Sequence, residues 1–301
     1  MKNIIIATIL LIAPMLSKAD LNVFVCEPEW AAIAQEIGGD KVKTNSATSA
    51  LQDPHYIQAR PSLIAKIRAA DLIVCSGAQL EIGWLPMLLR KGNNPGVMPG
   101  NPGFLEASRY VKRLDVAANP DRSQGDVHPQ GNPHIQTNPH NIRLVAVAMT
   151  ERMKQLDADN AQTYQQGLDE FSQRWTAAVA DWETQALPLR GKKVIAHHKS
   201  WVYLENWLGL VEVATLEPVP GIPPTAGHLA SLLDSFGNNN GADFIIRAPF
   251  QSEKPSKWLS ERTGIPAVML PLSVGGSDQS SDLFKWFDDI LDRLLTARDI
   301  K

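Results

Sequence analysis

The chain contains little cysteine and almost no net charge. Only two of its 301 residues are cysteine, Cys26 and Cys75, and the formal net charge is -3 at pH 7. Two isolated cysteines have no Cys-x-x-Cys spacing, which argues against a cysteine metal centre. A charge this small provides no basic field for nucleic acid, and no Lys/Arg cluster marks a membrane-binding surface. These absences favour a small ligand, and we expect no nucleic acid to bind.

Long hydrophobic runs are also missing. The apolar run at residues 4–16 is shorter than the roughly 20 residues that cross a bilayer. It follows a charged start and precedes Ser-Lys-Ala, a small-x-small pattern typical of signal cleavage. We therefore predict that residues 1–19 are a secretory signal peptide, with an uncleaved anchor or a buried helix as the alternative. No cysteine stands directly after the cleavage site, which argues against a lipid anchor, so we expect a periplasmic protein.

Both cysteines stand at the ends of apolar runs. Cys26 follows residues 21–25 and Cys75 follows residues 71–74. If these runs are neighbouring strands of one parallel sheet, a disulfide is feasible in an oxidising compartment. Two buried free thiols are the alternative.

Strand and helix patterns alternate along the chain, which is typical of parallel sheets covered by helices. The predicted strands are residues 21–26, 41–48, 71–75, 192–196, 211–215, 242–247 and 267–270. The predicted helices are residues 29–38, 60–70, 138–156, 157–187, 201–208, 225–236, 255–263 and 283–297. The fold class is therefore α/β, with two doubly wound domains joined by one long backbone helix. We predict domains at 20–156 and 188–301 and the linking helix at 157–187.

The long predicted helix carries large apolar side chains on one face. They recur every three or four residues: Tyr164, Leu168, Phe171, Trp175, Val179 and Trp182. Helical spacing alone explains this pattern, so we interpret these side chains as core rather than as cofactor contacts. Residues 91–103 and 117–133 are rich in Gly, Pro or Asn, which predicts loops.

Three histidines, far apart in the chain, stand after predicted strands or in the loops that follow. They are His55 in Asp-Pro-His, His134 in Asn-Pro-His-Ile, and His198 in His-His-Lys-Ser-Trp. In open α/β sheets, ligands collect at the carboxyl ends of the strands. These three side chains are therefore candidate metal ligands.

The ordered set of motifs carries a family resemblance. Asp-Pro-His at 53–55 with Arg-Pro-Ser at 60–62, Asn-Pro-His-Ile at 132–135 and His-Lys-Ser-Trp at 198–201 resemble the solute-binding proteins of zinc and manganese ABC transporters. Glu-Pro at 217–218 and the Pro- and Gly-rich stretch after it are similar to a loop of that family. The resemblance covers essentially the whole chain after residue 19.

The resemblance implies a protein that binds one divalent ion between two α/β domains and delivers it to a cognate ABC permease in the inner membrane. Carried over to this chain, His55 and His134 match the ligands of the first domain and His198 matches the first ligand of the second. We expect a monomer. The family often adds an Asp after the last strand of the second domain, but residues 269–273 contain no carboxylate.

The fourth ligand is therefore open between water and four carboxylates: Glu217, Glu253, Asp278 and Asp282. Three imidazoles without an obvious Asp favour Zn²⁺ over Mn²⁺, because manganese prefers oxygen ligands. A manganese-binding homologue remains the alternative within the family. A zinc hydrolase or hydratase could use the same three histidines, but the chain has neither His-Glu-x-x-His nor Gly-x-Ser-x-Gly. We therefore predict that it is not an enzyme.

The other histidines receive simpler interpretations. His128 is the only histidine in the loop before His134, and we expect an exposed loop residue, with an accessory ligand as the alternative. His197 should point away from the site that His198 faces, because neighbouring residues near a strand end point in different directions. His140 in a first helical turn should be structural, and His228 should lie on the surface.

Overall fold

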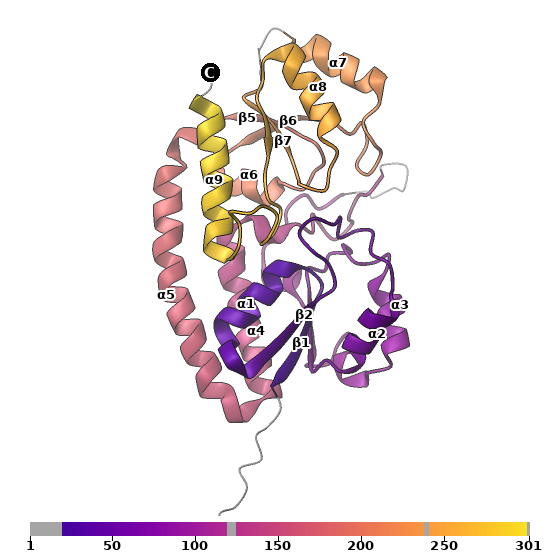
Figure 1. The fold of residues 1–301 in the computed structure, drawn as a ribbon, viewed down its shortest axis with the longest axis vertical. Helices are drawn as coiled ribbons and strands as arrows, with labels where there is room; N and C mark the ends of the chain where they lie inside the picture. The colour runs from indigo at the N-terminus through magenta and orange to yellow at the C-terminus, as the bar shows by residue number, and fades with distance from the viewer. Residues whose placement is uncertain (1–19, 119–124, 238–240, 300–301) are drawn as a thin grey trace, which may run out of the picture.

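The computed structural model describes residues 20–118, 125–237 and 241–299. The predicted signal peptide lies outside these ranges. In Figure 1 the described chain forms two lobes, one above the other, with a long helix along one side. Each lobe contains a parallel four-stranded sheet, and the two strand orders are β2-β1-β3-β4 and β6-β5-β7-β8. The predicted α/β class with two doubly wound domains is confirmed.

The first sheet is built from β1 (Leu21–Val25), β2 (Val42–Ser46), β3 (Leu72–Cys75) and β4 (Phe104–Glu106). Its helices are α1 (Pro28–Gly38), α2 (Pro61–Arg68), α3 (Leu85–Gly92) and α4 (Pro139–Leu156). The β3 side chains are all buried, as expected for a strand covered by helices on both faces. β3 therefore reads as a continuous apolar run and not as an alternating one.

The second sheet repeats the arrangement with β5 (Lys193–Ala196), β6 (Val211–Thr215), β7 (Phe244–Arg247) and β8 (Ala267–Met269). Its helices are α6 (Val202–Leu208), α7 (Ala226–Phe236), α8 (Glu253–Thr263) and α9 (Leu283–Asp299). Gly209 ends α6 in the left-handed conformation at φ 70°, which a residue with a Cβ adopts only at a cost. The predicted strands and helices of this half agree with the structure to within a few residues.

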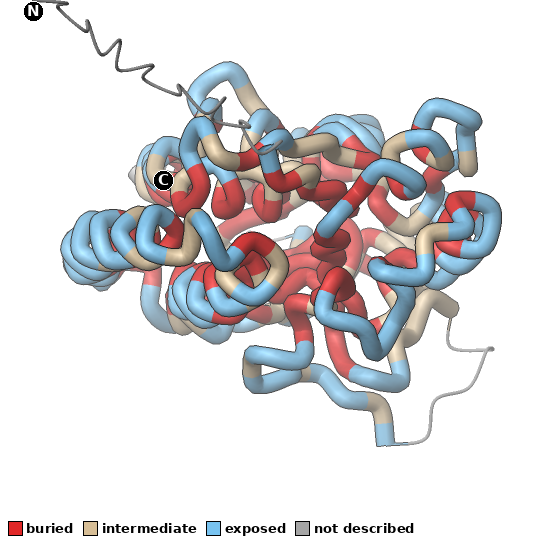
Figure 2. Tube along the Cα trace, turned by 90° about the horizontal axis from the view of Figure 1, so that it is seen from below, coloured by how far each residue is buried: buried red, intermediate tan, exposed pale blue. Residues whose placement is uncertain are grey.

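The long helix α5 (Ala161–Gln185) packs against α1 and α4 of the first lobe and against α9 of the second. Trp175 and Trp182 lie against Phe284 and Phe287 of α9, with ring centroids 5.0 to 6.4 Å apart. One buried apolar cluster runs from Leu21 to Ala297 and includes side chains of both lobes and of α5. Figure 2 shows these buried residues gathered between the helices. The lobes therefore share one core, and α5 joins them as a rigid spine.

A disulfide joins Cys26 to Cys75. β1 and β3 are paired neighbours, with Val25 opposite Val74, so the next residue on each strand lies at the same sheet edge. The two Cα atoms are 4.8 Å apart, within the usual range for a disulfide. The structure therefore contains the disulfide and not the two free thiols that were the alternative.

Some local predictions were wrong or incomplete. Helix α3 and strand β4 had not been predicted, because short elements give a weak periodic signal. The segment predicted as one helix from residue 157 begins with the 3₁₀ turn Ala158–Asn160, and α5 ends before Leu187. The domain limits 20–156, 157–187 and 188–301 remain a prediction.

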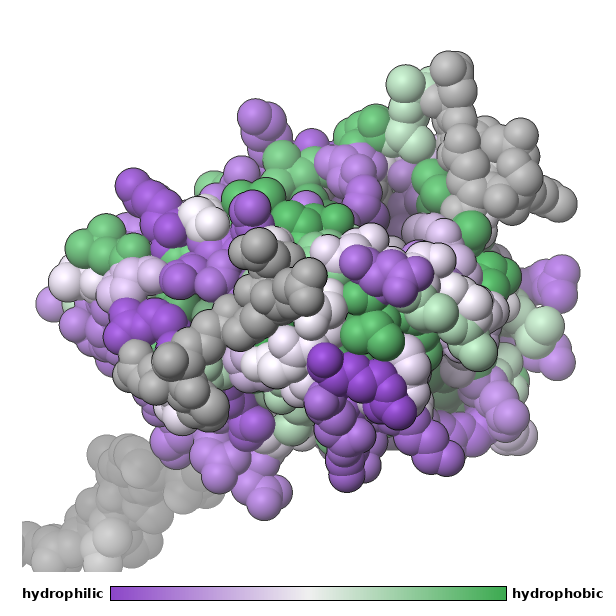
Figure 3. Space-filling model, turned by 90° about the horizontal axis from the view of Figure 1, so that it is seen from above, coloured by the Kyte–Doolittle hydropathy of each residue, from purple (hydrophilic) through white to green (hydrophobic). Residues whose placement is uncertain are grey.

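No helix in the described parts of the chain is both long and apolar enough to cross a membrane. Figure 3 shows hydrophilic side chains spread over the face seen from above, with apolar ones between them in small groups.

Candidate metal centre

His55 is held by its own loop, which follows β2. The Asp53 carboxylate accepts hydrogen bonds from the His55 backbone N–H at 3.0 Å and from ring Nδ1 at 2.7 Å. The carbonyl oxygen of Pro54 accepts a hydrogen bond from Trp84 Nε1 at 2.9 Å, so the loop is tied to the segment after β3. Because Asp53 engages Nδ1, the lone pair of His55 Nε2 can bind a metal ion.

His134 sits immediately before the 3₁₀ turn Ile135–Thr137 that leads into α4. Its backbone N–H donates to Asn132 Oδ1, and its carbonyl accepts from Thr137 Oγ1. Only 1% of the residue is exposed, yet neither ring nitrogen has a hydrogen-bond partner in the described structure. Leaving a buried polar group unpaired costs about 1–3 kcal/mol, so this imidazole is positioned for a partner other than a protein side chain.

His198 lies just beyond β5, separated from it by His197. Its Nδ1 lies 2.7 Å from Glu217 Oε2, and the same oxygen accepts a hydrogen bond from the Gly221 backbone N–H at 2.8 Å. A carboxylate that engages Nδ1 orients the ring and leaves Nε2 free, the usual arrangement behind a metal-bound imidazole. Glu217 was a candidate fourth ligand, but in the structure it orients His198.

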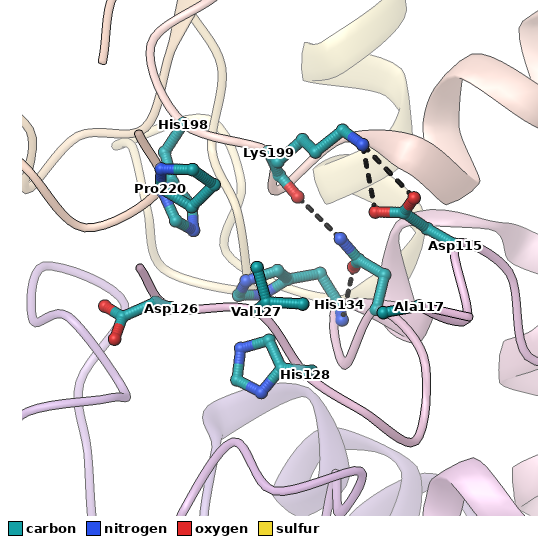
Figure 4. A pocket seen from close by; sticks show the side chains of 10 residues that line it. Asp115, Ala117, Asp126, Val127, His128, His134, His198, Lys199 and Pro220 are labelled. Carbon is teal, nitrogen blue, oxygen red and sulfur yellow. Dashed lines mark hydrogen bonds and ion pairs between the residues drawn. The ribbon is translucent and has the colours of Figure 1, made fainter. Parts of the chain in front are cut away.

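The three predicted histidines come together between the two lobes. Their ligand nitrogens all lie within 4.8 Å of one another. The His55 ring centroid is 5.4 Å from that of His134 and 5.7 Å from that of His198. His134 and His198 line a cavity of about 320 Å³, and Figure 4 shows both rings facing it. The fold thus supplies three convergent imidazole nitrogens from both lobes.

The surroundings keep these groups in the states that a metal requires. Burial, reinforced by the neighbouring histidines, holds the pKa of His134 well below its usual value, so its imidazole is neutral. Burial opposes ionisation of Asp53, but its hydrogen bonds with His55 and the charge of that ring hold the Asp53 pKa below its usual range. The neutral imidazole of His134 and the ionised carboxylate of Asp53 behind His55 both suit divalent metal binding.

The remaining carboxylate candidates lie elsewhere. Glu253 is 3.7 Å from Arg247, and Asp282 pairs with Lys285 at 3.2 Å. Asp278 is exposed. None belongs to the histidine cluster among the residues that the structure describes, so these three candidates are not supported.

His128 does not behave as the exposed loop residue that had been expected. It is half-buried, and its Nε2 lies 3.3 Å from Nε2 of His55. The two rings stack with centroids 5.4 Å apart. A signal was present in the sequence, since His128 is the only histidine in the loop that leads to His134, but only the folded loop places it against His55.

The other histidines lie outside the cluster of three. His197 is buried, and burial lowers its pKa. His140 is exposed and pairs with Glu183 at 2.8 Å. His228 was expected on the surface, but it is half-buried and its Nε2 contacts the carbonyl of Thr215 at 2.9 Å. That contact secures α7 to the end of β6.

Polar contacts hold the two lobes together around the cluster. Asn132 Nδ2 donates to the carbonyl of Lys199 at 2.6 Å, and Tyr203 donates to the carbonyl of Asn132 at 2.9 Å. Lys199 pairs with Asp115 at 3.1 Å, as Figure 4 shows. On another side, Ser273 donates to the buried carboxyl group of Glu29. The position of His134 relative to His198 is therefore set by several fixed contacts.

Comparison with known proteins identifies the family. The model of the family described as zinc-uptake complex component A, periplasmic (ZnuA), matches residues 23–297. The chain belongs to this family. Its members are solute-binding proteins of metal ABC transporters and are not enzymes, so the predicted absence of enzymatic activity is supported by the family assignment. As a member, the chain is the substrate-binding component of such a transporter, which implies a permease as its partner.

Named relatives include a manganese ABC transporter substrate-binding lipoprotein, scaA, of Streptococcus gordonii. It is 23% identical over 255 residues, which cover 83% of this chain and 79% of the relative. Another, the manganese ABC transporter lipoprotein PsaA of Streptococcus pneumoniae, is 22% identical over 280 residues, covering 90% and 87%. These similarities extend over most of both chains.

Solved structures confirm the fold. A crystal structure of ZnuA superposes with a TM-score of 0.75 at 23% identity, covering 91% of this chain and 99% of that one. A manganese-bound periplasmic metal-binding protein from Candidatus Liberibacter asiaticus has a TM-score of 0.73 at 18% identity, covering 92% and 100%. The relatives and the structural neighbours of this chain are thus named for different metals.

Proposed function

We propose that this family member captures a single Zn²⁺ ion between its lobes and delivers it to an ABC permease for import. His55, His134 and His198 would be the protein ligands. The observation that carries the proposal is His134, a buried imidazole with two unpartnered nitrogens, beside two imidazoles that carboxylates orient. A divalent ion between the three rings would give the His134 imidazole the partner that it lacks.

Zinc is favoured over manganese by the chemistry of the ligands. The three clustered side chains offer only nitrogen, and Mn²⁺ prefers carboxylate, carbonyl and water oxygens. The two carboxylates that contact the clustered histidines, Asp53 and Glu217, are engaged with histidine Nδ1 atoms. The manganese-binding alternative requires an oxygen ligand from the protein, and the segment after β8 has no carboxylate at residues 269–273.

The experiment is a competition titration of the protein, first stripped of metal, with Zn²⁺ and Mn²⁺ against a chelator of known affinity. We expect one Zn²⁺ per chain and far weaker Mn²⁺ binding. His140→Ala is the matched control, because His140 is exposed and pairs with Glu183. Mn²⁺ binding as tight as Zn²⁺ binding would contradict the choice of metal but leave the transport assignment intact.

The family assignment and the N-terminal sequence support a place of action outside the cytoplasm. We propose that residues 1–19 direct export, that the mature protein works as a periplasmic monomer, and that the lobe surfaces beside the site contact the permease. Deleting the gene should impair growth under chelation, and added zinc should restore it. Unimpaired growth in strong chelator, in a strain without a second zinc importer, would remove the import role.

A further inference from the structure

Residues 125–128 form a short strap that crosses the gap between the lobes next to the histidine cluster. On the second lobe, the Asp126 backbone N–H donates to the carbonyl of Pro220 at 2.9 Å. On the first lobe, Tyr56 donates to the Asp126 carboxylate at 2.7 Å. The strap is thus anchored to both loops that carry metal-site residues, the His55 loop and the Glu217 loop.

Two glycines allow this close approach. Gly125 and Gly221 both have φ +79°, a conformation that residues with side chains rarely adopt. A Cβ on Gly125 would overlap the carbonyl oxygen of Pro220, and a Cβ on Gly221 would overlap the carboxylate of Asp126. The strap and the Glu217 loop therefore fit together only because both positions lack a side chain.

The strap ends on His128. Two nitrogens bound to one tetrahedral Zn²⁺, at Zn–N distances of about 2.0–2.1 Å, lie about 3.3 Å apart. The Nε2 atoms of His55 and His128 are already 3.3 Å apart. The backbone of Ala78 lies beside the His128 ring.

The turn that carries Ala78 has an uncommon backbone. Ala78 and Gln79 have φ values of 50° and 72°, which non-glycine residues rarely adopt and which cost about 1–3 kcal/mol each. Such conformations cluster at ligand sites, where surrounding structure holds them.

We propose that His128 is the fourth protein ligand, so that His55, His128, His134 and His198 enclose the ion in four nitrogens, and that the strap thereby selects Zn²⁺ over Mn²⁺. This inference rests on the proposed function. Zn²⁺ with four protein ligands has a closed tetrahedral shell, and a shell without oxygen disfavours Mn²⁺. Of the four, only His55, His134 and His198 have ligand nitrogens within 4.8 Å of one another, so on binding the His128 ring would move from His55 toward the other two.

The test uses the full mature chain loaded with Co²⁺ as a spectroscopic probe and with Zn²⁺ for affinity. Wild-type protein should give an intense tetrahedral Co²⁺ spectrum that added azide does not alter, and zinc X-ray absorption should fit four nitrogens from imidazole. His128→Ala should open one position, so that azide changes the Co²⁺ spectrum. Zn²⁺ affinity should fall by roughly tenfold to a hundredfold, whereas His140→Ala should match wild type.

Two further variants test the strap itself. Gly125→Ala keeps the His128 side chain, but the added Cβ prevents the strap from packing against Pro220. The variant should therefore reproduce the azide sensitivity of His128→Ala. His128→Asp replaces a nitrogen with an oxygen ligand and should raise Mn²⁺ affinity relative to Zn²⁺ affinity. Circular dichroism would show whether His128→Ala disturbs the fold. If it does, the azide response of Gly125→Ala decides whether His128 is a ligand.

The outcomes separate this inference from the proposed function. If wild-type protein binds Zn²⁺ through His55, His134 and His198, but His128→Ala keeps its affinity and an azide-insensitive spectrum, the fourth-ligand assignment is wrong and the proposed function stands. A His128→Ala variant that only loads more slowly, with unchanged affinity, also overturns the assignment. Wild-type protein that binds no Zn²⁺ would refute the proposed function itself.

Discussion

In the first sheet the strand order is β2-β1-β3-β4, and in the second it is β6-β5-β7-β8, so β1 and β5 occupy equivalent central positions. At the carboxyl end of β1 stands Cys26, bonded to Cys75. At the carboxyl end of β5 stand His197 and His198. The same edge of the same topology therefore carries a covalent crosslink in one lobe and a candidate ligand in the other.

The difference reflects how each lobe positions its histidines. His198 lies two residues beyond β5, next to His197, whose backbone N–H donates to the carbonyl of Ile246 on β7. His55 and His134 lie on loops beyond the first sheet, and their positions depend on side-chain contacts such as Trp84 to Pro54. A ligand on a loop needs a rigid support beneath it, and the disulfide joins the two strands under these loops.

Removing the disulfide should produce the largest loss of stability. The bond closes a loop with a sequence separation of 49 residues, for which the chain-entropy model gives about 4 kcal/mol. Cys26→Ser with Cys75→Ser should lower the free energy of unfolding by that order in urea titrations. Reducing the wild-type protein should have the same effect, while the reductant should leave the double variant unchanged. Equal stability with and without the bond would show that it does not support the first lobe.

Single ligand substitutions test the two lobes against each other. His55→Ala, His134→Ala and His198→Ala should each weaken Zn²⁺ binding about a hundredfold, because about 10 kcal/mol or more of binding energy is divided among few ligands. His197→Ala should retain affinity in the same competition assay. Loss of binding in His197→Ala with full binding in His198→Ala would mean that the other histidine of the pair faces the ion.

The carboxylates behind the rings give a smaller effect. Asp53→Asn and Glu217→Gln keep the shape of each side chain but remove the charge that favours the Nδ1–H tautomer. Each should weaken Zn²⁺ binding by roughly tenfold to a hundredfold. Glu217→Gln should be the more disruptive, since Glu217 also accepts from Gly221. An unchanged affinity in both variants would remove their orienting role.

The contact between lobes at Glu29 should make stability depend on pH. Burial first, and then the charge of Glu27, raise the pKa of Glu29 to about 8 from 4.5, whereas the Ser273 hydrogen bond lowers it. The folded protein therefore holds a proton that the unfolded chain loses, so this stabilisation is present below about pH 4.5 and is lost as pH rises through 8. The slope is at most about 1.4 kcal/mol per pH unit.

Glu29→Gln should flatten the fall in urea midpoint between pH 5 and pH 8. Ser273→Ala removes the hydrogen bond that lowers the pKa of Glu29, so it should extend the same fall to higher pH. If the urea midpoint depended on pH in the same way in both variants, Glu29 would not be protonated in the folded protein.

The smallest expected change is in overall shape. Because α5 packs against α1, α4 and α9 within one continuous core, metal binding should produce small tilts of the lobes and local ordering of loops and not a wide hinge closure. Solution scattering should give nearly equal radii of gyration with and without Zn²⁺. A large contraction on binding would mean that the shared core does not hold the lobes at a fixed angle.

Periodicity was sufficient to predict most of the elements. The apolar runs of β1, β3, β5 and β7 and the aromatic face of α5 were visible because burial on a sheet or along a helix imposes a regular spacing on the chain. The eight-residue helix α3 and the three-residue strand β4 were missed, because so few residues show no clear period. Boundaries shifted by a few residues where side-chain caps and 3₁₀ turns end an element.

The candidate site divides in the same way. The histidine motifs were recognisable from sequence because each is local, and the pairing of Cys26 with Cys75 was at least feasible from their places after two strands. The role of Glu217 was not predictable: its contact with His198 depends on how the loop after β6 folds back towards β5. Its distance from His198 is set by sheet register, which no local pattern encodes.

By itself, the sequence determined most of the strands and helices, the spine and the three histidines, because these depend on side-chain type and spacing along the chain. Only the tertiary structure decided which nitrogens converge, that Glu217 orients a ring, and that His128 meets His55. These outcomes depend on how two sheets and a shared helix pack together. Residues distant in the chain become neighbours only when that packing buries a common core.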